Sequence, residues 1–238
     1  MKIALIGYGK MGRTVERFAL QRGHEITSKI DKDNTEDIYS DAFRYSDAAI
    51  EFSCPEAAFA NVSASLKLGV PVVCGTTGWR EKLDEAKLLC AESGTGFIHS
   101  SNFSLGVNIF FYINRRLAES MKNHRNYVPS IRELHHIHKK DAPSGTAITL
   151  ADDIAGILGL SGWALDACRP DVLRIAATRE GEAPGTHEVA YESETDSIVI
   201  RHEARSRDGF ALGAVVAAEF IAGKRGVFDM GDVLGLGS

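Results

Sequence analysis

Residues 2–13 read KIALIGYGKMGR, and this stretch decides the fold of the N-terminal half of the 238-residue chain. Its first five residues, Lys2–Ile6, form a short apolar run that is typical of a buried parallel strand. Glycines follow at once with the spacing Gly7-x-Gly9-x-x-Gly12, and the segment 11–22 has the apolar periodicity of a helix. A strand, a glycine-rich turn and a helix in this order predict the first unit of a parallel α/β sheet.

The same glycines predict a dinucleotide-binding site. In such a turn the first glycine allows the tight bend, the second lets the backbone approach a pyrophosphate, and the third lets helix and strand pack closely. Asp31 lies 19 residues after Gly12, where it would accept hydrogen bonds from ribose hydroxyls and favour NAD. Lys32 beside it would pair with the 2′-phosphate of NADP. We therefore expect NADH, NADPH or both as cofactors; the alternative is that Asp31 and Lys32 are only a solvated charge pair.

The rest of the first half repeats the pattern of strand and helix. Strands are predicted over residues 25–30, 48–53, 70–74 and 96–99, with helices over 55–68 and 80–92. This alternation predicts a doubly wound parallel sheet of the Rossmann type. The polar loops 75–78 and 100–103 each follow a predicted strand, so they would face the cofactor at the carboxyl edge of the sheet.

The pattern changes after residue 102. Helices are predicted over residues 105–121, 145–158 and 210–221, and strands over 131–135, 172–178, 187–192 and 197–203. Strands this close in sequence indicate an antiparallel or mixed sheet, and hence a second, smaller α+β domain.

Composition excludes several classes of function. The net charge of −5 argues against a general nucleic-acid binder, and no apolar run approaches the roughly 20 residues that span a bilayer. The first strand begins at residue 2, which leaves no room for a signal peptide, and the four cysteines are scattered without CxxC spacing. We therefore expect a cytoplasmic protein that binds neither nucleic acid nor membrane.

The second informative stretch is ELHHIHKKDAPSGTA, residues 133–147. Three interpretations of its histidines and lysines compete. His136 and His138 would share a face of a strand and could bind a metal, but the adjacent lysines would repel a divalent cation. The run could also be a solvated basic surface. The third interpretation is an anion site with acid catalysis, since Ser144, Gly145 and Thr146 read as a helix start whose free N–H groups can hold a carboxylate. Hydride addition to a conjugated substrate would then be completed by a proton from a lysine or an imidazolium.

These residues together closely resemble the 4-hydroxy-tetrahydrodipicolinate reductase (dihydrodipicolinate reductase) family of lysine and diaminopimelate synthesis. The resemblance runs nearly end to end. It rests on the segments GYGKMGR (7–13), CGTTGW (74–79), SNFSLGVN (101–108), ELHHIHKKDAPSGTA (133–147), REGEAPGTHEV (179–189) and FALGAVVAAEFIAGKRGVFDMGDVLGL (210–236).

The resemblance implies a role for each matching residue. It implies catalytic roles for His135 and Lys139, and substrate contacts by His136, Ser144, Gly145 and Thr146. The implied cofactor contacts are Gly7, Tyr8, Gly9, Lys10, Met11, Gly12, Asp31, Lys32, Gly75, Thr76, Thr77, Ser100, Ser101, Asn102 and Phe103. No metal is implied.

The resemblance also implies an assembly. It predicts a nucleotide domain of residues 1–103 and 208–238, a substrate and oligomerisation domain of residues 104–207, a homotetramer and a small dicarboxylate substrate. The alternatives are another amino-acid-linked dehydrogenase, such as an aspartate dehydrogenase, and a non-catalytic NAD(P) sensor.

Overall fold

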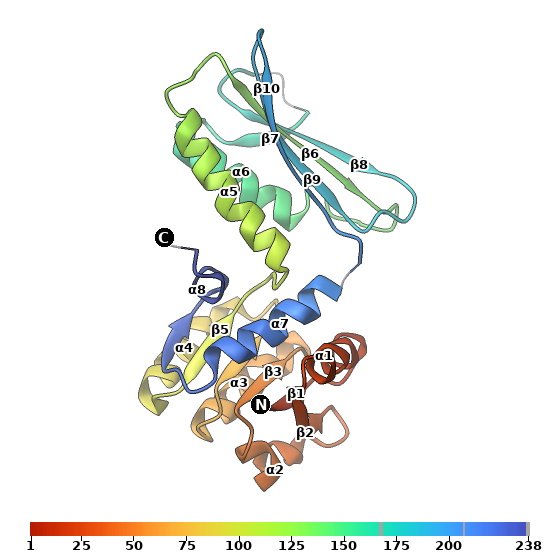
Figure 1. The fold of residues 1–238 in the computed structure, drawn as a ribbon, viewed down its shortest axis with the longest axis vertical. Helices are drawn as coiled ribbons and strands as arrows, with labels where there is room; N and C mark the ends of the chain where they lie inside the picture. Colours follow the sequence, from red (N-terminus) through yellow and green to blue (C-terminus); the bar gives the residue numbers. More distant parts are fainter. Residues whose placement is uncertain (167–168, 207, 237–238) are drawn as a thin grey trace. The chain divides into compact units, whose positions relative to one another are not determined.

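The computed structural model describes residues 1–166, 169–206 and 208–236, so Cys168 lies outside the described residues. The chain divides into two compact units, Met1–Leu105 with Asp208–Ser238, and Gly106–Arg207 (Figure 1). Each unit is built around its own sheet. The parallel sheet in the first unit and the mixed sheet in the second confirm the predicted fold class.

The first unit contains a six-stranded sheet whose order is β11-β5-β4-β3-β1-β2. Every strand pair in it is parallel. The strands are β1 (Lys2–Ile6), β2 (Glu25–Ile30), β3 (Ala48–Glu51), β4 (Val72–Cys74), β5 (Gly96–His99) and β11 (Gly226–Phe228). The helices are α1 (Lys10–Gln21), α2 (Asp41–Arg44), α3 (Pro55–Lys67), α4 (Leu83–Ser93), α7 (Asp208–Ile221) and α8 (Met230–Leu234), with 3₁₀ turns η1 (Thr35–Tyr39) and η2 (Arg80–Lys82).

Helices cover both faces of this sheet, which explains why its central strands are mostly apolar. Ile3 and Leu5 of β1 point to the core shared with α1 and α7, whereas Ala4 and Ile6 point to the core shared with α2, α3 and α4. The period-2 alternation of a strand thus feeds two separate cores, each on one face of the sheet. Because the two cores fill the central strands, the predicted site residues of this unit lie in the loops at the strand ends.

The end of the chain returns to the first unit. α7 packs along α1, and β11 adds the outermost parallel strand beside β5. α7 also packs closely on the loop after β5, because a Cβ at Gly213 of α7 would lie 1.7 Å from the carbonyl oxygen of Phe103. α7 thereby supports the loop that follows β5, one of the predicted cofactor loops.

The second unit contains a five-stranded mixed sheet whose order is β10-β9-β6-β8-β7. β10, β9 and β6 are antiparallel neighbours, while β6, β8 and β7 are parallel. The elements are α5 (Leu105–Met121), β6 (Val128–His135), α6 (Gly145–Leu158), β7 (Trp163–Leu165), β8 (Leu173–Arg179), β9 (Thr186–Glu192) and β10 (Ser197–Glu203). α5 and α6 lie side by side on one face of the sheet (Figure 1), and they bury a core with Ile131, Ile175 and Val189.

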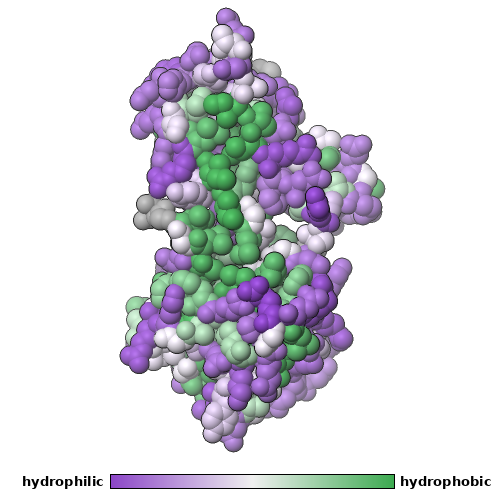
Figure 2. Space-filling view, in the orientation of Figure 1, coloured by the Kyte–Doolittle hydropathy of each residue, from purple (hydrophilic) through white to green (hydrophobic). Residues whose placement is uncertain are grey.

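Some hydrophobic side chains remain exposed on the second unit. Figure 2 shows hydrophobic residues gathered along α5, where Ile109 and Ile113 are 40% and 42% exposed. On the strands, Val128 and Val199 are also exposed. Among the described residues, no helix is long and apolar enough to cross a membrane.

Most predicted elements are confirmed, and the differences are local. The sequence analysis missed β7, β11, α2, α8 and η1, which are only three to five residues long. Such short segments hold too few residues to show a period, and tertiary pairing decides them. The predicted strand 70–74 begins at Val72, after Pro71, whose ring nitrogen has no hydrogen to donate to a ladder.

Candidate active site and cofactor site

The glycine turn after β1 packs closely at two glycines and is open at the third. Gly7 has a φ of +87°, and a Cβ there would lie 2.0 Å from the carbonyl oxygen of Phe52. A Cβ at Gly12 would lie 2.3 Å from the carbonyl oxygen of Gly7, so the first turn of α1 packs directly on the loop. At Gly9, in contrast, a Cβ would meet nothing within 4 Å. Gly9 is also the N-cap of α1, so the open space lies where free N–H groups can bind a phosphate.

The two predicted polar loops lie at the same edge of the sheet as this turn, because β1, β4 and β5 are parallel. Gly75 packs against the ring of Phe52, which a Cβ would approach to 2.0 Å. The N–H of Ser53 donates to Thr76 Oγ1 at 2.8 Å, and this bond joins the loop after β3 to the loop after β4. The loops after β4 and β5 carry the predicted contacts Gly75, Thr76, Thr77, Ser100, Ser101, Asn102 and Phe103.

A buried carboxylate supports these loops and was missed in the sequence. Glu51, at the end of β3, is fully buried and accepts hydrogen bonds from Cys74 Sγ at 2.9 Å and from the N–H of Ser53 at 3.1 Å. Burial, followed by the charge of Glu51, raises the pKa of the Cys74 thiol well above its ordinary value. Cys74 is therefore a protonated donor that holds the loops together.

Asp31 and Lys32 lie at the end of β2, and both side chains are exposed. Asp31 Oδ1 accepts a hydrogen bond from the N–H of Lys32 at 2.9 Å, while the N–H of Asp31 donates to Asn34 Oδ1 at 2.8 Å. The turn is thus internally bonded, and the second carboxylate oxygen of Asp31 takes part in neither bond. This arrangement can present an acceptor to a ribose hydroxyl.

In the second unit, His135 ends β6 on the face that α5 and α6 cover. Ile131, Glu133 and His135 alternate onto this face, and all three are buried. The imidazole of His135 lies 5.0 Å from that of His187, and a Cβ at Gly185 would be 3.0 Å from its Nε2. Burial lowers the pKa of His135 to about 4, although the charge of Glu133 opposes this shift. His135 is therefore neutral at neutral pH in the free protein.

Glu133 is the centre of a polar network beneath this site, and none of its side chain is exposed. Its Oε2 accepts a hydrogen bond from the N–H of Ser144 at 3.0 Å, and its Oε1 accepts one from Arg179 Nη2 at 2.8 Å. The same Oε2 lies 3.6 Å from His187 Nε2 and 3.8 Å from His135 Nδ1. Burial alone would raise the pKa of Glu133, but His187, Ser144 and Arg179 together hold it well below its ordinary value.

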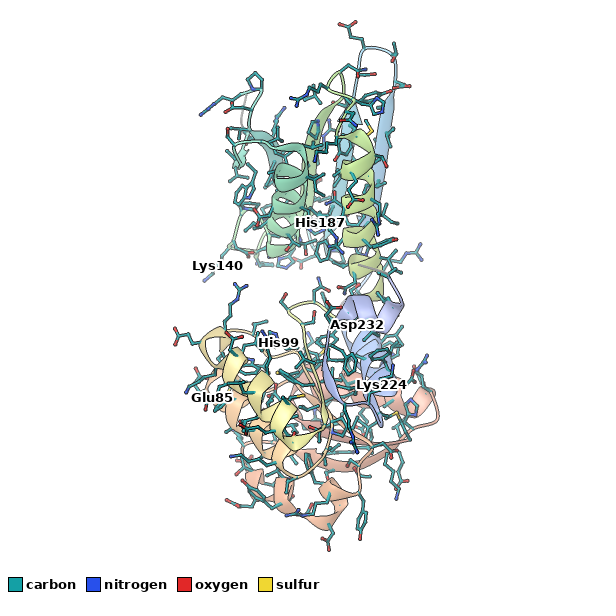
Figure 3. All side chains as sticks on the ribbon, turned by 90° about the vertical axis from the view of Figure 1, so that its left-hand side faces the viewer. Glu85, His99, Lys140, His187, Lys224 and Asp232 are labelled. Carbon is teal, nitrogen blue, oxygen red and sulfur yellow. The ribbon has the colours of Figure 1, made fainter. Side chains whose placement is uncertain are left out.

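Lys139 lies in the loop between β6 and α6. Its Nζ contacts both oxygens of Asp141, at 2.9 and 2.8 Å, and this hydrogen bond lowers the pKa of the Asp141 carboxyl. The Lys139 side chain is only 22% exposed. Lys140, in contrast, is exposed and projects from the same end of the unit that holds His187 (Figure 3). The two adjacent lysines therefore have different environments.

The first turn of α6 begins at a serine N-cap and leaves open space for an anion. Ser144 is the N-cap, and its Oγ accepts a hydrogen bond from the N–H of Ala147 at 3.2 Å and contacts His187 Nε2 at 2.9 Å. The first-turn N–H groups of Gly145 and Thr146 have no partner within the helix, as in any α-helix. Gly145 is exposed and a Cβ on it would meet nothing within 4 Å, so an anion can approach these groups.

His136 and His138 do not share a strand face, as the metal interpretation expected, because β6 ends at His135. His136 and His138 have ring centroids 6.0 Å apart, and His138 Nε2 contacts Glu182 at the surface. Within the part of the chain that the structure describes, the one group with metal-like spacing is Glu133, His135 and His187, whose ligand atoms lie within 4.8 Å of one another. Arg179 already donates a hydrogen bond to the Glu133 carboxylate of this group, and the positive charge of Arg179 would repel a divalent cation.

The sequence analysis thus missed Glu133, Arg179 and His187 as parts of the site. A signal was present for one of them. A glutamate two residues before His135 on a predicted strand must share its buried face, and a buried carboxylate requires partners. Arg179 and His187 come from β8 and β9, more than 40 residues away, and only the sheet pairing places them beside β6.

Comparison with known proteins gives a consistent result across the chain. Residues 1–103 match the family model described as "Dihydrodipicolinate reductase, N-terminus", and residues 106–234 match "Dihydrodipicolinate reductase, C-terminus". A 4-hydroxy-tetrahydrodipicolinate reductase from Christiangramia forsetii is 49% identical over 235 residues, which cover 98% of each chain. One from Paraburkholderia phymatum is 34% identical over 269 residues, which cover 99% of this chain and all of the relative.

A solved structure shares the fold. The dipicolinate-bound dihydrodipicolinate reductase from Paenisporosarcina sp. TG-14 aligns with a TM-score of 0.78 at 19% identity, covering 96% of this chain and 97% of that one. A diaminopimelate dehydrogenase from C. glutamicum aligns with a lower TM-score of 0.55 at 14% identity, covering 100% and 96% of the two chains.

Proposed function

The chain belongs to the dihydrodipicolinate reductase family, and from this premise we propose how its residues carry out the NAD(P)H-dependent reduction of 4-hydroxy-tetrahydrodipicolinate to tetrahydrodipicolinate. The overall change replaces a hydroxyl by a hydrogen. It consumes one hydride and one proton and releases one water. The observation that carries our assignment of the residues is the first turn of α6, where free N–H groups follow the loop that carries Lys139 and Lys140.

The substrate is a dicarboxylate, and the second unit offers groups for an anion. One carboxylate binds the N–H groups of Gly145 and Thr146, with the Thr146 hydroxyl as a further donor. His136, whose side chain is half-buried at the end of β6, contributes a second donor. Ser144 is already committed to the cap and to His187, so it shapes the turn and leaves the anion to its neighbours.

Proton transfer divides between His135 and Lys139. The pKa of His135 is lowered to about 4, so before substrate binds the imidazole is uncharged at neutral pH and is too weak an acid to be the proton donor. The Lys139 ammonium is the donor, and Asp141 holds it in place until the substrate carboxylate competes for it. The dianionic substrate favours a charged His135, which then assists as a hydrogen-bond donor and as a proton relay.

The first unit fits a nicotinamide dinucleotide. Gly9 and the first turn of α1 would hold the pyrophosphate, Asp31 and Lys32 would contact the adenosine ribose, and the loops after β4 and β5 would contact the nicotinamide ribose. Bound NADH or NADPH supplies the hydride.

A single assay tests this function against the two alternatives. NADH and NADPH oxidation is followed by absorbance with the hydroxy-tetrahydrodipicolinate that the preceding synthase makes, and then with oxaloacetate and ammonia. We expect turnover only with the first substrate. Turnover with oxaloacetate and ammonia would indicate an aspartate dehydrogenase, and cofactor binding without any turnover would indicate a sensor.

We also propose that the chain forms a homotetramer through the face of the five-stranded sheet that α5 and α6 leave uncovered. Val128 and Val199 are 65% and 49% exposed, and both point to that face. Light scattering coupled to size-exclusion chromatography gives the mass directly. A monomeric mass at micromolar concentration would contradict this assembly.

A further inference from the structure

The Glu133 carboxylate is an unusual group to bury. Its side chain is 0% exposed, and Arg179, its cationic partner, is 19% exposed. Burial of an ion pair contributes little to stability on average, because desolvation offsets the attraction. The contacts that Glu133 makes therefore matter more than its charge alone, and each of them leads to an element of the site.

One contact leads to the carboxylate-binding turn. Glu133 Oε2 accepts the N–H of Ser144, the N-cap residue whose position sets the direction of the first-turn N–H groups of α6. Ser144 Oγ in turn contacts His187 Nε2 at 2.9 Å, and His187 lies 3.6 Å from the same carboxylate oxygen. The cap is thus held from β6 and from β9 at once.

The other contact leads to the Lys139 loop. Arg179 Nη2 donates both to Glu133 Oε1 at 2.8 Å and to the carbonyl oxygen of Asp141 at 2.5 Å. Asp141 is the residue whose carboxylate holds Lys139. One guanidinium therefore connects the buried carboxylate to the loop that carries the proton donor.

We propose that Glu133 is the positioning residue of the site: it anchors both the carboxylate-binding turn of α6, through Ser144, and the Lys139 loop, through Arg179. Glu133 does not touch the substrate. This inference rests on the proposed function, because it assumes that the α6 turn and Lys139 bind and protonate the substrate.

Replacement by glutamine tests the anchor with almost no change in volume. Glu133 receives a hydrogen bond on each oxygen, from Ser144 and from Arg179, and an amide offers only one oxygen. Whichever way the amide is turned, its NH₂ group faces one of these donors, and that donor loses its acceptor. Glu133→Asp keeps both acceptors on a shorter side chain, so it should restore part of the function.

The readout is binding of pyridine-2,6-dicarboxylate, measured by calorimetry, together with kcat, KM and the Kd for NADH. For Glu133→Gln we expect at least a tenfold rise in the Kd for pyridine-2,6-dicarboxylate and in KM, a lower kcat and an unchanged Kd for NADH. Glu133→Asp should fall between Glu133→Gln and the unmodified protein. Glu119→Gln is the control, since the Glu119 side chain is exposed on α5 and pairs there with Arg116. We expect this variant to bind pyridine-2,6-dicarboxylate normally.

The outcomes separate this inference from the proposed function. If the unmodified protein neither turns over the substrate nor binds pyridine-2,6-dicarboxylate, the proposed function fails and the inference fails with it. If the unmodified protein does both, and a folded Glu133→Gln variant matches it in Kd, KM and kcat, only the anchor is overturned. A loss of thermal stability in Glu133→Gln with normal binding would show a merely structural role, and it also overturns the anchor.

Should Glu133→Gln fail to fold, Arg179→Lys takes its place. Lysine keeps the positive charge but has a single ammonium group, which cannot reproduce the planar guanidinium that bridges Glu133 and Asp141. We expect kcat to fall at least fivefold with an unchanged Kd for NADH. Normal kcat and KM in this variant would overturn the connection between Glu133 and the Lys139 loop.

Discussion

Replacing Lys139 by alanine tests the assignment of the proton donor, and the chain provides its own control. Lys139 and Lys140 are adjacent, but only Lys139 is half-buried and held by Asp141. A positioned general acid contributes about 10²–10⁴-fold to a rate. We therefore expect kcat of Lys139→Ala to fall by about 10²-fold or more, and Lys140→Ala to stay within about threefold of the unmodified enzyme.

The fold should tolerate Lys139→Ala, so a fall in kcat would report on catalysis and not on unfolding. The Asp141 side chain is 60% exposed, so water replaces Lys139 around its carboxylate. An exposed ion pair of this kind contributes only about 0–1 kcal/mol to stability. The pKa of Asp141, which the hydrogen bond from Lys139 lowers, should return toward its ordinary value. The Kd for NADH, measured by fluorescence, should be unchanged.

Lys139→Arg separates proton donation from electrostatics. Arginine retains the charge that binds a carboxylate, but its guanidinium does not release a proton at any ordinary pH. We expect KM to stay near normal while kcat falls nearly as far as in Lys139→Ala. Normal kcat in either Lys139 variant, or an equal loss in Lys140→Ala, would refute the assignment.

Three further predictions address the cofactor, the substrate site and pH. Asp31→Ala should weaken NADH more than NADPH, and Lys32→Ala should weaken NADPH selectively; equal changes in the two Kd values would mean that the pair only contacts solvent. Thr146→Val should weaken competitive inhibition by pyridine-2,6-dicarboxylate by about 1–3 kcal/mol through the lost hydrogen bond, and EDTA should leave activity intact, since inactivation reversed by a divalent metal would support the metal interpretation instead. The pKa of His135 is lowered to about 4 in the folded protein, so on acidification the unfolded chain takes up this proton first. His135 alone should therefore lower the free energy of unfolding by about 2 kcal/mol between pH 7 and pH 5. Urea denaturation of His135→Gln should lack that part of the pH dependence, and identical slopes would contradict the buried neutral imidazole.

The fold of the first unit could be predicted because its information is local. Strand, turn and helix are consecutive in residues 2–21, and the structure gives each glycine a separate steric reason. A Cβ at Gly7 or Gly12 would lie within 2.3 Å of a backbone oxygen, so no larger residue fits there. Gly9, in contrast, borders open space. The predicted loops meet because parallel strands end at one edge of a sheet.

In the second unit, the exposed loop and helix start could be predicted from the sequence, and the buried polar network could not. The helix start at Ser144 follows from the capping preference of serine and from the apolar period after it. Arg179 and His187 carry no local signal, since an arginine or a histidine on a strand is usually solvated. Their place beside Glu133 depends on the strand order β9-β6-β8, in which β6 lies between two strands that follow it in the sequence.

The separation between the interior and the surface also accounts for having two basic groups four residues apart. His135 is the last residue of β6 and is buried against His187 and Gly185, so it loses its charge in the free protein. Lys139 lies beyond the strand end, where Asp141 and solvent accompany its charge. The proposed mechanism uses this division: in it the surface group, Lys139, supplies the charge and the proton, and the buried group, His135, responds after the anion has bound. Glu133 touches both sides, since it lies 3.8 Å from His135 and reaches the Lys139 loop through Arg179. Its replacement by glutamine should therefore disturb substrate binding and proton transfer together, although Glu133 itself does not touch the substrate.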